Sequence, residues 1–120
     1  MSVRVLVVED EAIVAIDIAD QLTDAGFLVV GPAPSVAKAL KLIEEVGCDV
    51  AVLDVNLRDE TAEPIARVLR SRCTPFLFLS AVSRDHLPAG YNDEVLLPKP
   101  ARPAVLVAAL QSSVAGSSRK

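Results

Sequence analysis

Short apolar runs alternate with longer helical patterns five times along this chain of 120 residues. Such an alternation is typical of an α/β, doubly wound parallel sheet, in which each helix crosses over between neighbouring strands. Apolar residues make up 52% of the chain but aromatic residues only 3%, so Val, Leu, Ile and Ala must fill the core, as in sheets buried on both faces. We expect five strands with helices on both faces, at residues 3–8, 27–31, 50–53, 76–79 and 94–97.

The helical patterns between these strands differ in strength. Val14, Ile18 and Leu22 recur at four-residue spacing and predict a first helix that Gly26 closes. Ser35 is the expected N-cap of a second helix, and a third spans residues 63–71. A fourth helix at residues 83–87 should be short or irregular, because a Pro-Ala-Gly sequence follows it.

A last helix is predicted from residue 103 to about residue 114, and the chain then becomes rich in Gly and Ser. A chain of this length forms one domain. We therefore expect one domain at residues 1–115 and a frayed C-terminal tail at residues 116–120.

The net charge of −4 argues against direct binding to nucleic acid, because phosphate contacts need a basic surface. The sequence shows neither an apolar run of the roughly 20 residues that cross a bilayer nor a signal peptide. A cytoplasmic location without membrane attachment is expected. Cys48 and Cys73 lack the spacing of a metal site and are expected to be small apolar fillers.

Polar residues follow four of the predicted strands. Right-handed crossovers bring the carboxyl ends of parallel strands to one edge of the sheet, where ligands bind. Any one of these residues alone would be an ordinary cap or surface charge. Four strand ends that together deliver carboxylates, a hydroxyl and an ammonium instead predict a site. Its candidates are Glu9, Asp10 and Glu11 after the first strand, Asp54 and Asn56 after the third, Ser80 after the fourth, and Lys99 after the fifth.

The acids of this edge need a counter-charge, because two carboxylates about 4 Å apart repel by roughly 4 kcal/mol at an effective dielectric near 20. A divalent cation, Mg²⁺ or Mn²⁺, would offset the repulsion, since Mg²⁺ prefers hard oxygen ligands and leaves room for a phosphate oxygen. The candidate metal ligands are the carboxylates of Glu9, Asp10 and Asp54 and the backbone carbonyl of Asn56.

Asp54 ends the apolar run VAVLD and should be partly desolvated. With a cation beside it, this carboxylate can attack a phosphoryl donor and form an aspartyl phosphate. Lys99 would neutralise one phosphoryl oxygen, and the Ser80 hydroxyl would bind another. Asp54, Lys99 and Ser80 are thus the candidate catalytic residues.

The ordered motifs VVED, VLDVN, FLS and PKP resemble those of bacterial response-regulator receiver domains over residues 3–110. The resemblance implies a flavodoxin-like strand order 2-1-3-4-5 and a cis Lys99–Pro100 peptide. It also implies a phosphoacceptor of a two-component phosphorelay that phosphorylates and dephosphorylates itself and is not a turnover enzyme. Within the family, TPFLFLSA is similar to a stand-alone alphaproteobacterial subgroup with the motif Pro-Phe-x-Phe-x-Ser/Thr.

One departure from the family concerns switching. Most receivers carry an aromatic residue three positions before the lysine, whereas this chain has Leu96 there. A switch based on that ring is not available. We expect phosphorylation to order or shift residues 81–93 instead.

The donor chemistry is absent from the chain, so the resemblance implies a sensor histidine kinase or a histidine phosphotransfer protein as partner. Three roles stay open for a single receiver: phosphate relay or sink, phosphorylation-dependent binding of a partner protein, and modulation of a kinase. Two alternatives compete with these roles. One is a pseudo-receiver that is never phosphorylated, and the other is a phosphatase of the haloacid dehalogenase type, whose Asp-x-Asp motif is replaced by Asp54-Val55-Asn56.

Overall fold

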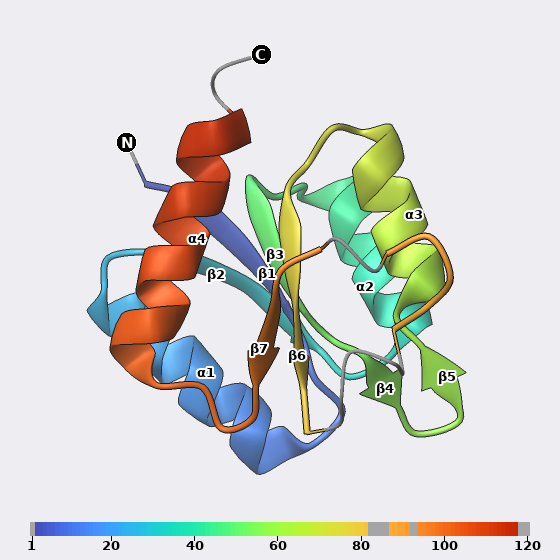
Figure 1. The fold of residues 1–120 in the computed structure, drawn as a ribbon, viewed down its shortest axis with the longest axis horizontal. Coiled ribbons are helices and arrows are strands. Elements are labelled where there is room, and N and C mark those ends of the chain that lie inside the picture. Colours follow the sequence, from blue (N-terminus) through green and yellow to red (C-terminus); the bar gives the residue numbers. More distant parts are fainter. Residues whose placement is uncertain (1, 82–86, 92–93, 118–120) are drawn as a thin grey trace.

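The computed structural model describes residues 2–81, 87–91 and 94–117, with side chains described as far as residue 115. Its centre is a parallel five-stranded sheet in the order β2-β1-β3-β6-β7 (Figure 1). This order confirms the flavodoxin-like arrangement that the resemblance implied. The five strands are β1 (Arg4–Val8), β2 (Leu28–Ala33), β3 (Val50–Asp54), β6 (Phe76–Ser80) and β7 (Leu96–Pro98).

Within the part of the chain that the structure describes, two helices cover each face of the sheet. Helices α1 (Ala12–Asp24) and α4 (Pro103–Ser117) lie on one face, and α2 (Val36–Glu45) and α3 (Glu63–Ser71) lie on the other (Figure 1). Successive side chains of β1 point to opposite faces of the sheet and belong to two separate hydrophobic cores. Leu6 packs in the core under α2 and α3, and Val7 packs in the core under α1 and α4. The doubly buried sheet predicted from the aliphatic composition is therefore confirmed.

Most predicted helix ends agree with the structure. The Ser35 hydroxyl accepts a hydrogen bond from the Lys38 backbone N–H over 3.2 Å, which confirms it as the N-cap of α2. Helix α3 spans the predicted residues, whereas α4 continues to Ser117, three residues past its predicted end. The predicted fourth helix, at residues 83–87, lies almost wholly outside the described residues, as do residues 118–120 of the predicted tail.

The last strand is shorter than predicted. It begins at Leu96 instead of residue 94, because Glu94 turns toward α3 and pairs with Arg70 over 2.7 Å. The Glu94 backbone N–H also donates to the carbonyl of Tyr91, within a turn. An ion pair to a helix therefore replaces sheet pairing at this residue.

A short hairpin was missed by the sequence analysis. Strands β4 (Asn56–Leu57) and β5 (Glu60–Thr61) pair antiparallel directly after β3, and Arg58 lies in their turn with a φ of 47°. The Glu60 carboxylate accepts a hydrogen bond from the Val36 backbone N–H over 3.2 Å, at the start of α2. This contact holds the hairpin beside the carboxyl edge of the sheet.

The two cysteines have different surroundings. Cys48 is half-buried against the core on the α2 and α3 side, and burial raises the pKa of its thiol to about 11. Cys73 is exposed and follows α3 with a φ of 58°. The expectation that both are apolar fillers holds for Cys48 and is wrong for Cys73.

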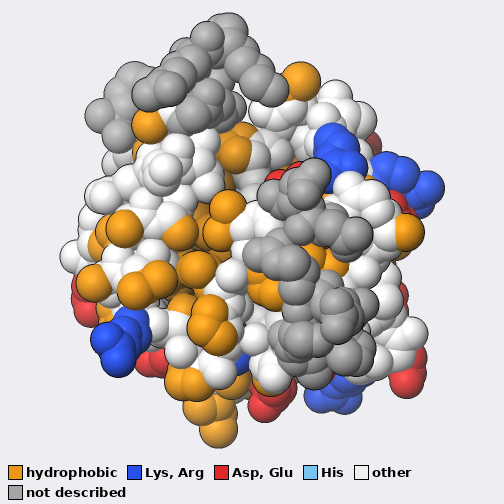
Figure 2. Space-filling view, viewed as in Figure 1, with side chains coloured by type: hydrophobic (Ala, Val, Ile, Leu, Met, Phe, Trp, Pro, Cys, Tyr) orange, Lys and Arg blue, Asp and Glu red, His pale blue; other side chains and the backbone are white. Residues whose placement is uncertain are grey.

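Helix α4 is apolar around most of its circumference, so some of its side chains face solvent. Figure 2 shows hydrophobic side chains gathered over α4 and β7, and Val105 is 46% exposed. None of the described helices is both long and apolar enough to cross a membrane.

Candidate functional site

The carboxyl edge of the sheet holds the polar groups that the strand ends were predicted to deliver. Glu9 directly follows β1, Asp54 is the last residue of β3, Ser80 is the last residue of β6, and Lys99 directly follows β7. Glu9, Asp54 and Ser80 are each at most 6% exposed and are the buried polar residues of the described chain. Charges are rarely buried without partners, so this edge is the candidate site.

Lys99 lies between two of the carboxylates. Its Nζ is 2.6 Å from Glu9 Oε1 and 3.0 Å from Asp54 Oδ2. The lysine side chain is 15% exposed, and water therefore screens these pairs only weakly. The Lys99 ammonium therefore offsets the repulsion between the Glu9 and Asp54 carboxylates within the protein itself. From the sequence, this role was predicted for a divalent metal cation alone.

Burial sets the protonation of the site. It raises the pKa of Glu9 and of Asp54, while the Lys99 ammonium opposes the rise for both carboxyls. A backbone hydrogen bond from Asn56 further favours the Asp54 carboxylate. Burial alone would lower the pKa of Lys99, but its two carboxylate partners raise it overall. The lysine therefore stays charged, as its predicted role requires.

Three carboxylates converge into a candidate cation site. One oxygen each from Glu9, Asp10 and Asp54 lies within 4.8 Å of the others. Glu9 Oε2 accepts a hydrogen bond from the Glu11 backbone N–H over 3.2 Å, which fixes the orientation of the carboxylate. An all-oxygen set of this kind fits a hard divalent cation. The Asn56 carbonyl stays a predicted ligand.

Ser80 is joined to Lys99 through the backbone. The Lys99 N–H donates to the Ser80 carbonyl over 3.0 Å, which holds the lysine beside the end of β6. The Lys99–Pro100 peptide is cis, as the resemblance implied. The role predicted for the Ser80 hydroxyl stays a prediction.

Arg58 is a site neighbour that the sequence analysis missed. Its Nε lies 3.6 Å from Asp10 Oδ2, so a second cation faces the acidic cluster from the β4–β5 hairpin. Its position four residues after Asp54, in the loop that leaves the site, was the available signal.

Tyr91 is a second missed residue, and it lies where residues 87–91 meet α3. Its ring is buried, and the ring centre lies 6.2 Å from the ring centres of Phe76 and Phe78. The Arg70 guanidinium stacks 4.0 Å from the ring centre, and the phenol donates to Glu63 over 3.2 Å. Leu96, which replaces the usual aromatic residue, is half-buried against the same core. An aromatic residue thus occupies this region from a different position in the sequence.

A family comparison identifies this constellation. The family model described as response regulator receiver domain matches residues 5–111, which include all the candidate site residues. The chain belongs to this family. As a receiver it is a signalling domain of two-component systems and not a turnover enzyme, so the phosphatase alternative is wrong. Receiver domains interact with histidine kinases as a class.

Solved and curated relatives agree with this assignment. A response regulator receiver protein from Sinorhizobium medicae has a TM-score of 0.85 at 30% identity, covering 97% of both chains. SdrG from Sphingomonas melonis has a TM-score of 0.81 at 35% identity, covering 95% of this chain and 97% of its own. The transcriptional regulatory protein PdtaR from Mycobacterium tuberculosis is 32% identical over 70% of this chain, which corresponds to 42% of its own length.

Proposed function

We propose that this receiver accepts a phosphoryl group on Asp54 from a histidine kinase or a histidine phosphotransfer protein. The observation that carries the proposal is the Lys99 ammonium, held 3.0 Å from the Asp54 carboxylate and 2.6 Å from Glu9. Such a cation beside a buried carboxylate can stabilise the charge that develops on a transferring phosphoryl group.

The transfer forms one bond and breaks one. An Asp54 carboxylate oxygen attacks phosphorus, the bond from phosphorus to the donor nitrogen breaks, and the nitrogen keeps the electron pair and takes up a proton. Lys99 and the Asn56 N–H favour the ionised Asp54 carboxylate against the effect of burial, and an ionised carboxylate needs no separate base for the attack. Lys99 pairs with a phosphoryl oxygen, and the Ser80 hydroxyl donates a hydrogen bond to another.

Glu9, Asp10 and Asp54 are the side chains that would hold Mg²⁺ or Mn²⁺, together with the Asn56 carbonyl. A bound divalent cation would supply positive charge against the phosphoryl oxygens. The fit rests on the convergence of three carboxylate oxygens within 4.8 Å. The chain's own part is to fix the acids: Lys99 holds Glu9 and Asp54 in place, and the Glu11 N–H orients Glu9.

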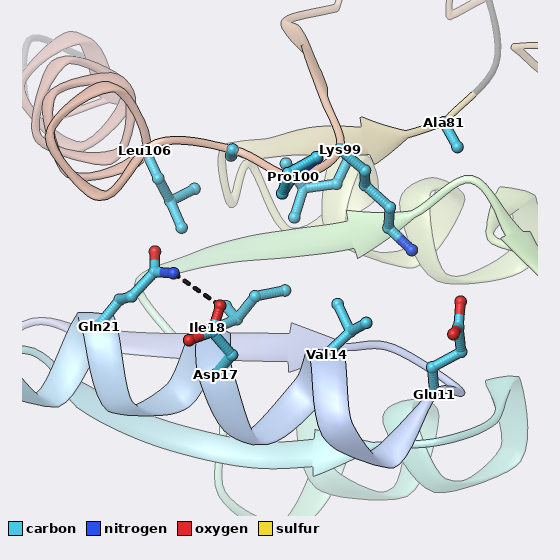
Figure 3. A pocket seen from close by; sticks show the side chains of 11 residues that line it. Glu11, Val14, Asp17, Ile18, Gln21, Ala81, Lys99, Pro100 and Leu106 are labelled. Carbon is cyan, nitrogen blue, oxygen red and sulfur yellow. Dashed lines mark hydrogen bonds between the residues drawn. The ribbon is translucent and has the colours of Figure 1, made fainter.

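The surface beside the site suits a protein donor. A pocket of about 290 Å³ lies next to Lys99, between α1 and the start of α4, and Figure 3 shows Val14 and Ile18 facing Pro100 and Leu106 across it. Outside this pocket, α1 also exposes Ile13, by 84%, and Ile16, by 59%, and Ile16 lines a separate hollow with Glu9 and Asp10. We assign these apolar surfaces on the two sides of α1 to the protein that carries the phosphohistidine, because both adjoin the edge where the phosphoryl group must arrive.

A relative supports the chemistry. One solution structure is described as the BeF₃-activated conformation of SdrG from Pseudomonas melonis, at 35% identity over 95% of this chain and with a TM-score of 0.78. Beryllofluoride stands in for a phosphoryl group on a carboxylate. The same reaction at Asp54 would make this chain a relay or sink for phosphate, or a protein that binds a partner when phosphorylated, in the cytoplasm.

Mass spectrometry after incubation with phosphoramidate and Mg²⁺ tests the proposal. The wild type should gain the mass of one phosphoryl group, and Asp54→Ala and Asp54→Asn should gain none. Asp59→Asn is the matched control, because this exposed aspartate lies in the hairpin five residues away and should leave labelling intact. Equal labelling of the wild type and the Asp54 variants would contradict the proposal. A wild type that binds neither phosphoryl nor beryllofluoride would favour the pseudo-receiver alternative.

A further inference from the structure

We propose that Arg58 is a phosphodonor-binding residue of this receiver, and that Asp10 holds its guanidinium until a divalent metal cation occupies the cluster of Glu9, Asp10 and Asp54. The inference rests on the proposed function, because it assigns a residue to the same phosphoryl transfer. Its starting point is the hairpin formed by β4 and β5, which places a guanidinium in front of the three carboxylates.

Backbone and side-chain contacts hold the hairpin, whereas the Arg58 side chain is exposed and has one weak contact to Asp10 among the described residues. The Ala62 N–H donates to the Val55 carbonyl over 3.1 Å, and Glu60 binds the start of α2. These contacts hold the turn at the rim of the site. The Arg58 side chain is 78% exposed, and its ion pair to Asp10 is 3.6 Å long. Such a pair is weak and exchanges readily.

The turn conformation adds a second observation. Arg58 has a φ of 47°, a region in which Gly or Asn is ordinarily favoured and in which a residue with a Cβ is strained. Strained residues of this kind cluster at functional sites. An arginine at this position, aimed at an acid of the site, is therefore more than a convenient turn residue.

The cations of the site are divided between its acids. Lys99 pairs with Glu9 and Asp54, whereas Arg58 pairs with Asp10. A divalent cation bound to Asp10 would compete with Arg58 for the same carboxylate. The displaced guanidinium is then free to bind the phosphoryl group of a donor. Its planar set of N–H groups can donate two parallel hydrogen bonds to two phosphoryl oxygens. Arg58 should thus weaken metal binding and strengthen donor binding.

Two measurements on Arg58→Gly test these opposite effects. Glycine removes the guanidinium and suits the positive φ, so the turn should be retained. Free Mn²⁺ followed by electron paramagnetic resonance should show that the variant binds Mn²⁺ about two- to fivefold more tightly, the size expected for loss of an exposed ion pair. The phosphoramidate concentration that gives half-maximal labelling should rise about three- to tenfold, with little change in the maximal rate.

Arg67→Ala is the matched control, because Arg67 forms a similarly exposed ion pair, 3.8 Å from Glu63, on α3. It should change neither quantity. Arg58→Lys keeps the positive charge but loses the paired N–H donors of the guanidinium. Its Mn²⁺ affinity should therefore stay near that of the wild type, while donor binding weakens. A general loss of structure would weaken Mn²⁺ binding and cannot imitate the expected result.

Unchanged or weaker Mn²⁺ binding by Arg58→Gly would overturn the competition at Asp10. An unchanged half-maximal phosphoramidate concentration would overturn donor binding. If the wild type takes up no phosphoryl group, the proposed function fails and donor binding fails with it, but the Mn²⁺ titration still decides whether Arg58 competes for Asp10.

Discussion

The Tyr91 phenol donates a hydrogen bond to Glu63 Oε2 over 3.2 Å, between residues that are 28 positions apart. Arg70 completes the contact, since its guanidinium stacks on the ring, donates to the Gly90 carbonyl and pairs with Glu94. Residues 87–91 and 94 are thus joined to α3 by polar and aromatic contacts. The same residues lie within or next to the segment expected to respond to phosphorylation.

Removal of the Tyr91 hydroxyl should destabilise the fold. We expect Tyr91→Phe to lower the free energy of unfolding by about 0.5–1.5 kcal/mol, because Glu63 loses a partly buried hydrogen-bond donor. Urea denaturation at neutral pH measures the change. In a double-mutant cycle with Glu63→Ala, which removes the acceptor, the loss of stability in the double variant should be smaller than the sum of the two single losses. Glu44→Gln, on the exposed side of α2, is the control, and strict additivity would show that the hydrogen bond contributes nothing.

Alkaline pH should weaken the same contact. Burial, followed by the charge of Glu63, raises the pKa of Tyr91 above its ordinary value, so folding favours the protonated phenol. Its stabilising contribution is complete below the unfolded pKa of about 10 and is lost as pH rises through the folded pKa. Above about pH 10, wild-type stability should therefore fall more steeply with pH than that of Tyr91→Phe. Parallel curves would contradict this expectation.

Loss of Lys99 should leave two buried carboxylates without their shared cation. We expect Lys99→Met to lower the free energy of unfolding by about 3–5 kcal/mol in the presence of EDTA. Excess Mg²⁺ should restore part of this loss, because it supplies positive charge to the same acids. Lys41→Met, on the exposed face of α2, should have little effect and serves as the control. A variant as stable as the wild type would mean that water already screens Glu9 from Asp54.

Addition of Mg²⁺ should stabilise the wild type through the three carboxylates. At a concentration tenfold above its dissociation constant, a cation bound only by the folded state adds about 1.4 kcal/mol. The thermal unfolding midpoint should rise by about 3–8 °C, and the rise should be lost in Asp10→Asn. K⁺ at matched ionic strength controls for screening. Equal shifts with both salts would argue against a specific site.

Phosphorylation should change residues 81–93, of which residues 82–86, 92 and 93 lie outside the described chain. Amide hydrogen exchange with and without beryllofluoride and Mg²⁺ measures the effect by peptide. We expect slower exchange in this segment and unchanged exchange in α2. Identical exchange in both states would show that phosphorylation does not order residues 81–93. That ordering is what we expect here, since Leu96 replaces the aromatic ring of other receivers.

The fold was predictable because its signals are local and repeated. Buried strands such as VAVLD are continuous apolar runs, and helix patterns separate them, so composition and periodicity alone predict a doubly wound sheet. The site followed from topology, since parallel strands must deliver Glu9, Asp54 and Lys99 to one edge. The strand order was supplied by family resemblance and not by periodicity.

The missed features depend on contacts that no local pattern encodes. The β4–β5 hairpin has strands of two residues, too short for alternation to show. Glu94 looked like the start of a strand, but its partner Arg70 is 24 positions away. Tyr91 carries no sequence sign that its partners lie on α3. The position of Arg58, four residues after Asp54 in the sequence, could have indicated that it lies near the site. Its contact with Asp10, however, depends on the conformation of the turn.

Tyr91 has a practical consequence for spectroscopy. It is the single tyrosine of a chain that contains no tryptophan. Near-ultraviolet absorbance and emission above the phenylalanine range therefore arise from one chromophore, which is stacked under a guanidinium and bonded to a carboxylate. Any rearrangement of that corner of the molecule can be followed optically in the unlabelled protein, without a dye.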